Sequence, residues 1–170
     1  AAPRLVQRNA WANIDDRTVY WFSVWREEAS SWAADNPVAL TGVWVATWIR
    51  DRFGFFNPCG ADPDWGAGTY DPHCISCPLE LEKADHRVFI NADRLGEHCQ
   101  LRVELLNREF APIPGYSGAD CLPLSGSGMR EEVSWSGGNT LPAVDHPVRV
   151  RVNWEGVRPE DGRLFAVYVN

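Results

Sequence analysis

The chain has 170 residues, of which 45% are hydrophobic, and its formal net charge is −7. This length fits one large domain, or one domain with part of another. The acidic balance, without a run of Lys or Arg, argues against nucleic acid or an anionic membrane surface as a partner. No apolar run reaches the roughly 20 residues that span a bilayer, so no membrane span is expected. The chain contains 9 Trp, 12 Pro and 14 Gly, and so many turn-forming residues are typical of all-β proteins.

Residues 1–52 are predicted to form a three-stranded, blade-like β-meander. Residues 9–14 and 18–25 make a hairpin in this prediction, because the second run (TVYWFSVW) is rich in strand formers and Asp15-Asp16-Arg17 favours a turn. Residues 38–49 make the third strand, bent at Gly42. Alternation places aromatic or aliphatic groups on both faces, so the meander needs cover on both sides, like one blade of a propeller.

Residues 53–78 are predicted to be a long irregular loop that carries Cys59, Cys74 and Cys77. The loop is rich in Pro and Gly, and we find no helical periodicity in it. A loop of this length is usually functional or cross-linked.

Residues 79–170 are predicted to form an antiparallel, jelly-roll-like β-sandwich. Residues 99–105 and 148–154 alternate strictly, with apolar side chains on one face and polar side chains on the other. Further strands are predicted at 87–92, 130–135 and 163–169, with turns at 94–97, 137–139 and 159–162. Strands at this spacing, joined by Gly- and Pro-containing turns and without a helix signal, indicate a sandwich or jelly roll.

The 5 Cys residues leave two interpretations open. In an oxidising compartment Cys59 pairs with Cys74 or Cys77, which stabilises a protein by about 3 kcal/mol when the closed loop has about 15 residues. In a reducing compartment Cys74-x-x-Cys77 has the spacing of a zinc knuckle, but zinc needs four ligands and a second clear Cys or His pair is missing. We prefer the disulfide and expect no cofactor; if zinc binds instead, Cys59, Cys74 and Cys77 are its candidate ligands. Further candidate ligands are His73, His98 and Cys99.

Three aromatic residues are candidates for binding glycan. Aromatic rings bind sugars by stacking on the apolar face of a pyranose. Trp32, Trp65 and Tyr70 lie in predicted loops rather than on alternating strands, so their rings are the ones free to do so. The Trp residues of the predicted strands are expected in the core or in an interface instead.

Two carboxylate pairs have the residue type that a glycosidase uses, namely Asp15 with Asp16 and Asp62 with Asp64. Both pairs lie in turn-like sequence, where Asp caps backbone N–H groups. We therefore interpret them as turn residues. We find no Gly-rich phosphate loop and no convincing Ser/His/Asp set.

The polar faces of the two strictly alternating strands carry charges of both signs. Arg102 and Glu104 lie on one strand, and Arg149 and Arg151 lie on the other. These residues predict either a cross-strand charge ladder, worth about 0.2–1 kcal/mol for each pair, or a solvated sheet face. We take the solvated face as the default.

Eight short motifs keep one order between Arg50 and Tyr168. They are RDRFG (50–54), FINAD (89–93), LRVEL (101–105), PGYS (114–117), DC (120–121), VSW (133–135), PVRVRV (147–152) and LFAVY (164–168). Together they resemble the C-terminal β-sandwich module of secreted glycoside-hydrolase-like proteins with a five-bladed propeller. Residues 6–49 resemble the last propeller blade, which precedes that module. The resemblance implies a non-catalytic chain, because in such proteins the catalytic carboxylates belong to earlier blades.

The expected function is that of a non-catalytic terminal module or subunit of a secreted or periplasmic carbohydrate-active protein. Such a chain would be the tail of a longer protein or would complete a partner's propeller, and it would contact glycan. A protein partner, or a second copy of the chain, is expected to bind through the meander. Three alternatives stay open: a free-standing lectin-like protein, a metal-containing structural subunit, and a glycoside hydrolase in its own right.

Overall fold

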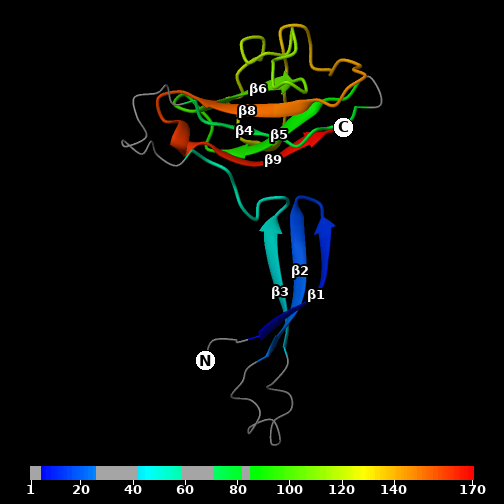
Figure 1. The fold of residues 1–170 in the computed structure, drawn as a ribbon. Coiled ribbons are helices and arrows are strands. Elements are labelled where there is room, and N and C mark those ends of the chain that lie inside the picture. Colours follow the sequence, from blue (N-terminus) through cyan, green and yellow to red (C-terminus); the bar gives the residue numbers. More distant parts are fainter. Residues whose placement is uncertain (1–4, 26–41, 59–70, 82–84) are drawn as a thin grey trace, which may run out of the picture. The chain divides into compact units, whose positions relative to one another are not determined.

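The computed structural model describes residues 5–25, 42–58, 71–81 and 85–170. Within these ranges the chain forms nine strands and one short 3₁₀ helix, Pro159–Asp161. The strands make three antiparallel sheets of three strands each (Figure 1), so the predicted all-β antiparallel fold is confirmed. The chain divides into two compact units, Ala1–Phe53 and Gly54–Asn170.

The first unit is a meander of three strands in the order β1-β2-β3. The strands are β1 (Leu5–Ile14), β2 (Arg17–Trp25) and β3 (Gly42–Ile49). Asp15 connects β1 to β2 with a φ of 52°, a left-handed conformation that Asp tolerates because its short side chain bonds locally. The backbone carbonyl of Asp16 accepts a hydrogen bond from the Arg50 N–H at 2.8 Å. Both residues thus serve the turns at one end of the sheet, as their turn-like sequence predicts.

The second unit holds two sheets with the strand orders β4-β8-β6 and β7-β5-β9. The first consists of β4 (His73–Ile75), β8 (Arg149–Glu155) and β6 (Gln100–Leu106). The second consists of β7 (Gly128–Glu132), β5 (Val88–Asp93) and β9 (Arg163–Val169). Figure 1 shows the two sheets as two layers, and a single hydrophobic core takes side chains from both.

The inward side chains of β6 and β8 form the centre of this core. Val103, Leu105, Val150 and Val152 are each at most 2% exposed, as their period-two alternation predicts. Fully burying one such side chain stabilises a fold by about 1.5–3 kcal/mol relative to leaving it in water. The two strictly alternating strands therefore carry much of the stability of the second unit.

Two strands differ from the sequence-based expectation. β4 lies within the stretch predicted as irregular, and its three residues are too few to show a periodicity. β7 ends at Glu132, before Val133 and Trp135, although both of these side chains are buried. The Val133 N–H still donates to the Val88 carbonyl of β5 at 2.9 Å, but beyond it the chain leaves β5, and Trp135 forms isolated bridges with Cys121 and Gly138 instead. Alternation of burial thus continues where regular strand pairing has stopped.

Candidate functional site

Several residues with a predicted role lie outside the described part of the chain. They are the glycan-binding candidates Trp32, Trp65 and Tyr70, the candidate ligand Cys59, and the carboxylate pair Asp62 and Asp64. The structure therefore tests neither the predicted stacking of these aromatic rings on a sugar nor a role for Cys59. The two other cysteines of the predicted loop, Cys74 and Cys77, are described.

Cys74 and Cys77 are free thiols, and so are Cys99 and Cys121. The preferred disulfide through Cys74 or Cys77 is therefore not formed. Cys74 lies on β4 and packs against the core, whereas Cys77 follows β4 and is exposed. A disulfide from the loop to Cys74 would have to reach into the interior of the sandwich.

The described cysteines and histidines do not gather into a metal site. Successive side chains on a strand point to opposite faces, so His73 lies on the outer face of the sheet while Cys74 points inward. Cys99 is buried elsewhere, where its Sγ lies 3.5 Å from the carbonyl oxygen of Pro159. Within the described ranges, no group of three or more His, Cys, Asp or Glu side chains is placed to hold a metal ion.

Burial raises the pKa of three of the four described thiols. Removal from water is the largest cause for Cys74, Cys99 and Cys121, because an apolar surrounding disfavours the charged thiolate. For Cys121 the hydrogen bond from the backbone N–H of Val103 and the charge of Arg102 act in the opposite direction but are smaller. These three thiols are therefore poor nucleophiles at neutral pH.

A compact polar cluster covers the outer face of the β4-β8-β6 sheet, and we call it the polar face. The strand register places His73, Asn153 and Arg102 in one row across the sheet. Ile75, Arg151 and Glu104 form the next row. The polar face consists of these polar side chains together with two neighbours, Asp71 and Glu155.

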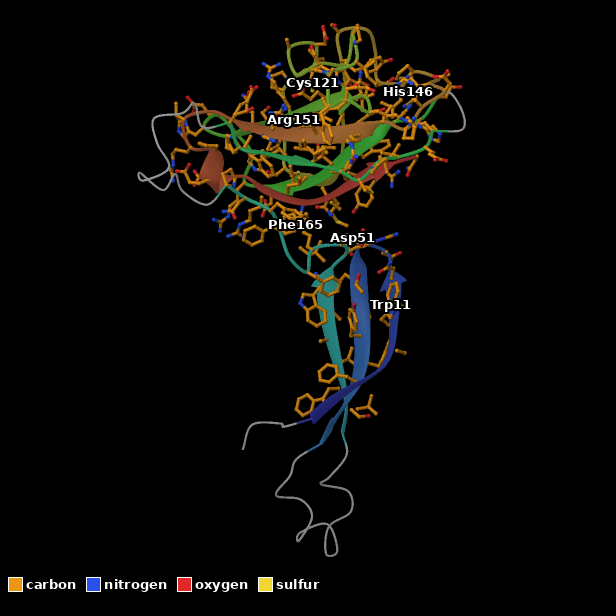
Figure 2. All side chains as sticks on the ribbon, viewed as in Figure 1. Trp11, Asp51, Cys121, His146, Arg151 and Phe165 are labelled. Atoms are coloured by element: carbon orange, nitrogen blue, oxygen red, sulfur yellow. The ribbon has the colours of Figure 1, made fainter. Side chains whose placement is uncertain are left out.

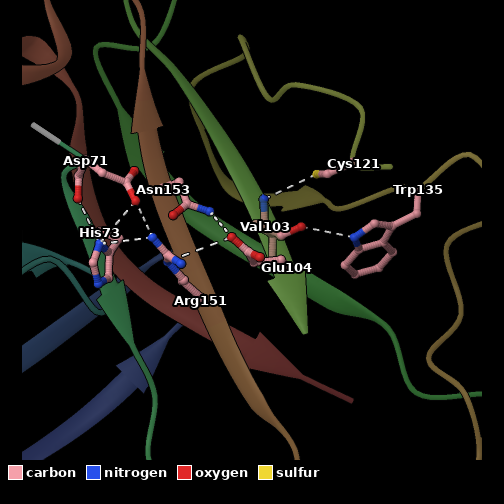
Figure 3. A network of polar contacts seen from close by, with 8 residues as sticks. All are labelled: Asp71, His73, Val103, Glu104, Cys121, Trp135, Arg151 and Asn153. Carbon is pink, nitrogen blue, oxygen red and sulfur yellow. Dashed lines mark hydrogen bonds and ion pairs between the residues drawn. The ribbon is translucent and has the colours of Figure 1, made fainter. Parts of the chain in front are cut away.

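Glu104 is the centre of the polar face, as Figure 3 shows. Its Oε1 accepts a hydrogen bond from Asn153 Nδ2 at 2.8 Å and forms an ion pair with Arg151 Nε at 3.8 Å. Arg151 in turn donates from Nη2 to Asp71 Oδ2 at 2.5 Å. Glu104 and Asn153 are only 8% and 6% exposed, so these contacts lie in a surrounding with little water, where polar interactions are strong.

His73 lies at the margin of this network and is exposed. Its Nδ1 is 2.8 Å from the backbone carbonyl oxygen of Asp71 and 3.2 Å from Arg151 Nη2. A carbonyl only accepts and a guanidinium only donates, so Nδ1 bonds to one of them at a time. The shorter distance favours the bond in which Nδ1 carries the proton and donates to Asp71.

Arg102 holds the loop between β6 and β7 against the polar face. Its Nη1 donates to the carbonyl oxygens of Gly118 at 3.1 Å and Cys121 at 2.6 Å, while its Nε donates to Glu155 Oε2 at 2.7 Å.

The default prediction of a solvated face is wrong at Glu104, because this side chain is buried. The alternative, a cross-strand pair, is found between Glu104 and Arg151.

Two buried atoms of the polar face have no hydrogen-bond partner among the described residues. They are Asn153 Oδ1 and Arg151 Nε. An acceptor and a donor that are buried without partners each cost roughly 1–3 kcal/mol of stability.

The first unit presents a different kind of surface, since both faces of its sheet are apolar. Trp11, Tyr20, Trp44 and Trp48 lie on one face, which we call the aromatic face. The Tyr20 ring contacts the Trp48 ring edge to face at a centroid distance of 5.4 Å and stacks on the Trp11 ring at 6.5 Å. Phe53 adds to this cluster at 5.4 Å from Tyr20. Figure 2 shows Trp11 among the side chains of this unit.

The opposite face of the same sheet is aliphatic, and we call it the aliphatic face. Its aliphatic side chains are Ile14, Val19, Val43, Val45 and Ile49, and the register places Trp21 and Arg17 on the same face. Val43 and Val45 are 70% and 56% exposed, and on the aromatic face Trp11 and Trp44 are 51% and 53% exposed. Contiguous apolar surface of this kind is rare on a monomeric soluble protein and usually marks an interface.

In comparisons with known proteins, no family model matches the chain, and no significant match is found among curated proteins or solved structures. In the described part of the chain, no helix has the length and apolar character needed to cross a membrane.

The sequence contains part of the information needed to predict the polar face. Polar residues alternate along both β6 and β8, and the Glu104–Arg151 pair follows once their register is known. Asp71, His73 and Asn153 are missed, because β4 is too short to be recognised and its pairing with β8 joins segments about 80 residues apart.

Proposed function

We propose that this chain is a non-catalytic β-module of a secreted carbohydrate-active protein, and that its first unit binds between two β-sheets of a partner. The observation that supports the partner is the exposure of both the aromatic and the aliphatic face of the β1-β2-β3 sheet. The carbohydrate-active role and secretion rest on the motifs between Arg50 and Tyr168 that resemble a propeller-associated module.

The chemistry of the two faces favours a two-sided partner over a second copy of the chain. A two-fold symmetric dimer buries the same patch on each copy. Such a dimer would cover the aromatic face with Trp44, or the aliphatic face with Val45, and leave the other in water. A partner that supplies one sheet to each face, as neighbouring propeller blades do, covers both.

A comparison of the free energy of burial with the cost of association supports the same choice. Burying about 400 Å² of apolar surface contributes roughly 10 kcal/mol at about 25 cal/mol/Å². Association itself costs an estimated 4–15 kcal/mol in lost freedom of motion. One face of this size only balances that cost, whereas two faces exceed it.

The first test uses two substitutions at neighbouring positions of β3. Trp44→Lys places a charge on the aromatic face and Val45→Lys places one on the aliphatic face. Without its partner, the wild-type chain is expected to self-associate at micromolar concentration, as measured by light scattering after size exclusion. Each variant should reduce this association, because each face exposes apolar side chains that favour contact with another copy. Val157→Lys is the control, since Val157 is exposed in the second unit.

The outcomes separate the candidates. A closed dimer that only one of the two β3 variants disrupts would contradict the two-sided partner and indicate a second copy of the chain. A well-folded monomer of 19.1 kDa that does not self-associate would overturn the proposal. That result would favour a free-standing, lectin-like protein instead.

A further inference from the structure

We propose that the outer edge of β3 pairs antiparallel with the same edge of a second copy of the chain, so that two β1-β2-β3 sheets join into one sheet. This contact differs from the face-to-face dimer considered above, because it covers neither the aromatic nor the aliphatic face. Both faces stay open to the partner proposed above, and the inference does not depend on the carbohydrate-active role. The second copy follows from the self-complementarity of this edge.

The backbone of β3 alternates between groups that bond to β2 and groups that face away from it. In an antiparallel ladder the N–H and C=O of one residue point to one neighbouring strand, and those of the next residue point to the opposite side. The Arg50 N–H donates to the Asp16 carbonyl at 2.8 Å, in the same register as the β2–β3 pairing. Arg50 and the even-numbered residues of β3 therefore bond to β2, and the odd-numbered residues face the outer edge.

The outer edge of β3 thus presents a row of backbone donors and acceptors. The residues whose backbone faces this edge are Val43, Val45, Thr47 and Ile49. The Ile49 carbonyl already accepts from the Arg52 N–H at 3.1 Å, so Ile49 offers mainly its N–H. Among the described residues, no strand pairs with β3 on this side.

The other outer strand of the sheet, β1, is protected from such pairing, whereas β3 is not (Figure 1). The register of β1 shifts between Arg8 and Ala10, and bulges of this kind disturb an edge and prevent another strand from adding to it. β3 pairs with β2 without a shift, and its sequence GVWVATWI contains no Pro and no charged residue. The side chains at 43, 45, 47 and 49 are all exposed.

One register joins two copies of β3 with all of these groups, and it is centred on Ala46. In this register Val45 lies opposite Thr47 of the second copy in a hydrogen-bonded position, and Thr47 lies opposite Val45 by symmetry. Val43 lies opposite Ile49 in the same way. A two-fold symmetric contact of this kind is the commonest closed arrangement of identical chains.

The same register also pairs the tryptophans of the aromatic face. Trp44 lies opposite Trp48 of the second copy in a non-hydrogen-bonded position, where side chains approach most closely, and cross-strand aromatic pairs are favourable. These two side chains are 53% and 40% exposed in the single chain. A shift by two residues in either direction places Trp44 opposite Ala46 or Arg50 and loses both pairs. The side chains therefore select the register that the backbone allows.

The first test is a crosslink at the two-fold axis in the full chain, in a Cys77→Ser background that removes an exposed thiol. The two Ala46 Cα atoms are expected about 4.5 Å apart, within the range of a disulfide. Ala46→Cys should therefore form a covalent dimer with oxidised glutathione. Thr47→Cys is the matched control: it lies opposite Val45, so its Cα atoms are separated along the strand as well as across it, beyond the about 7 Å that a disulfide can span. It should give only the background of Cys77→Ser alone.

The second test removes a backbone donor at the edge. Thr47→Pro deletes an N–H that faces away from β2, and Pro is tolerated at such edge positions. It should raise the dissociation constant of the dimer at least about tenfold in light scattering, because both Thr47 N–H groups lose a hydrogen bond. Thr47→Val keeps the N–H and should associate as the wild type does.

Each outcome decides for or against the edge dimer. No crosslink for Ala46→Cys, equal crosslinking of Thr47→Cys, or an unchanged dissociation constant in a folded Thr47→Pro would each overturn it. If Thr47→Pro does not fold, as judged by circular dichroism, the crosslink of Ala46→Cys still decides. Association that Trp44→Lys and Val45→Lys reduce but Thr47→Pro does not would support the proposed function while contradicting the edge dimer.

Discussion

The indole Nε1 of Trp135 donates a hydrogen bond to the backbone carbonyl of Val103 at 3.0 Å, and both residues are buried. On the same edge of β6, the Val103 N–H donates to Cys121 Sγ at 3.3 Å (Figure 3). The neighbouring residues on this edge, Leu101 and Leu105, bond instead to the backbone of the loop that follows β6. Two side chains thus supply hydrogen-bond partners for the backbone N–H and C=O of Val103. Without them these polar groups would be buried and unpaired.

Trp135→Phe is expected to lower the free energy of unfolding by about 1–3 kcal/mol, because it leaves the buried Val103 carbonyl without its donor. Urea denaturation followed by circular dichroism measures the loss. Tyr116→Phe is the comparison, since it removes a partly buried hydrogen bond to the Thr140 carbonyl and should lose only about 0.5–1.5 kcal/mol. A loss for Trp135→Phe no larger than that for Tyr116→Phe would contradict this account of the β6 edge.

Val150→Asp is expected to unfold the second unit. Val150 is 2% exposed and belongs to the core between the two sheets, so the substitution would bury an unpaired carboxylate. The expected loss exceeds about 3 kcal/mol. The control is Val157→Asp at an 81% exposed position, which should change stability by no more than about 0.5 kcal/mol. The measurement is the melting temperature of both variants. If Val150→Asp melts at the same temperature as the wild type, the β8 register is wrong.

The strand faces of the second unit could be predicted because apolar residues alternate with polar ones along most of β6 and β8. Leu101, Val103, Val150 and Val152 are inward in both the sequence pattern and the structure. A one-residue shift would have moved all of them to water, so the pattern is strongly determined.

The particular contacts of the polar face could not be predicted, because they depend on which strands become neighbours. Glu104 meets Arg151 only through the β6–β8 register, and Asn153 meets His73 only through the short strand β4. Arg102 also donates to the carbonyls of Gly118 and Cys121, and Gly118 belongs to the loop that lies beside the Glu104 carboxylate. None of these contacts leaves a periodic signal in the sequence.

The four described thiols are expected to react with an alkylating reagent at very different rates. Cys77 is exposed and should react first, whereas Cys99 and Cys121 are 2% exposed. Burial also raises the pKa of Cys99 and Cys121, which lowers the fraction of reactive thiolate. Mass spectrometry of peptides after timed labelling gives the order. Labelling of Cys121 as fast as that of Cys77 in folded protein would contradict the described burial.

The stability of the second unit is expected to fall in the alkaline range because of Cys121. Its pKa is raised in the folded state by burial, so the unfolded chain loses this proton at a lower pH than the folded chain does. The contribution of Cys121 to the free energy of unfolding is therefore complete below the thiol pKa of the unfolded chain, about 8.5. It is lost as the pH rises through the thiol pKa of the folded chain. Urea denaturation at about pH 7 and about pH 10 should show a smaller alkaline loss in Cys121→Ser than in wild type. Cys77→Ser, at an exposed position, should follow the wild type; if it flattens the alkaline loss as much as Cys121→Ser does, burial is not the cause.

Alanine variants of three glycines in the second unit distinguish the cost of backbone strain from that of steric contact. Their losses in the free energy of unfolding should rank in a fixed order. Gly137 does not have a positive φ, and a Cβ added to it would meet no atom within 4 Å, so Gly137→Ala should change stability by no more than about 0.5 kcal/mol. Gly138 has a φ of 129° in equally open space, so Gly138→Ala should lose about 1–3 kcal/mol through strain alone.

Gly156, directly after β8, combines both effects. Its φ is 116°, and a Cβ there would clash with the backbone carbonyl oxygen of His98, which also accepts a hydrogen bond from the Arg158 N–H. Backbone cannot move aside as a flexible side chain can, so Gly156→Ala should lose about 1–3 kcal/mol for the contact in addition to the strain. Urea denaturation of the three variants should therefore give the smallest loss for Gly137→Ala and the largest for Gly156→Ala. Equal losses at Gly138 and Gly156 would show that the chain after β8 relaxes away from His98 and avoids the steric contact.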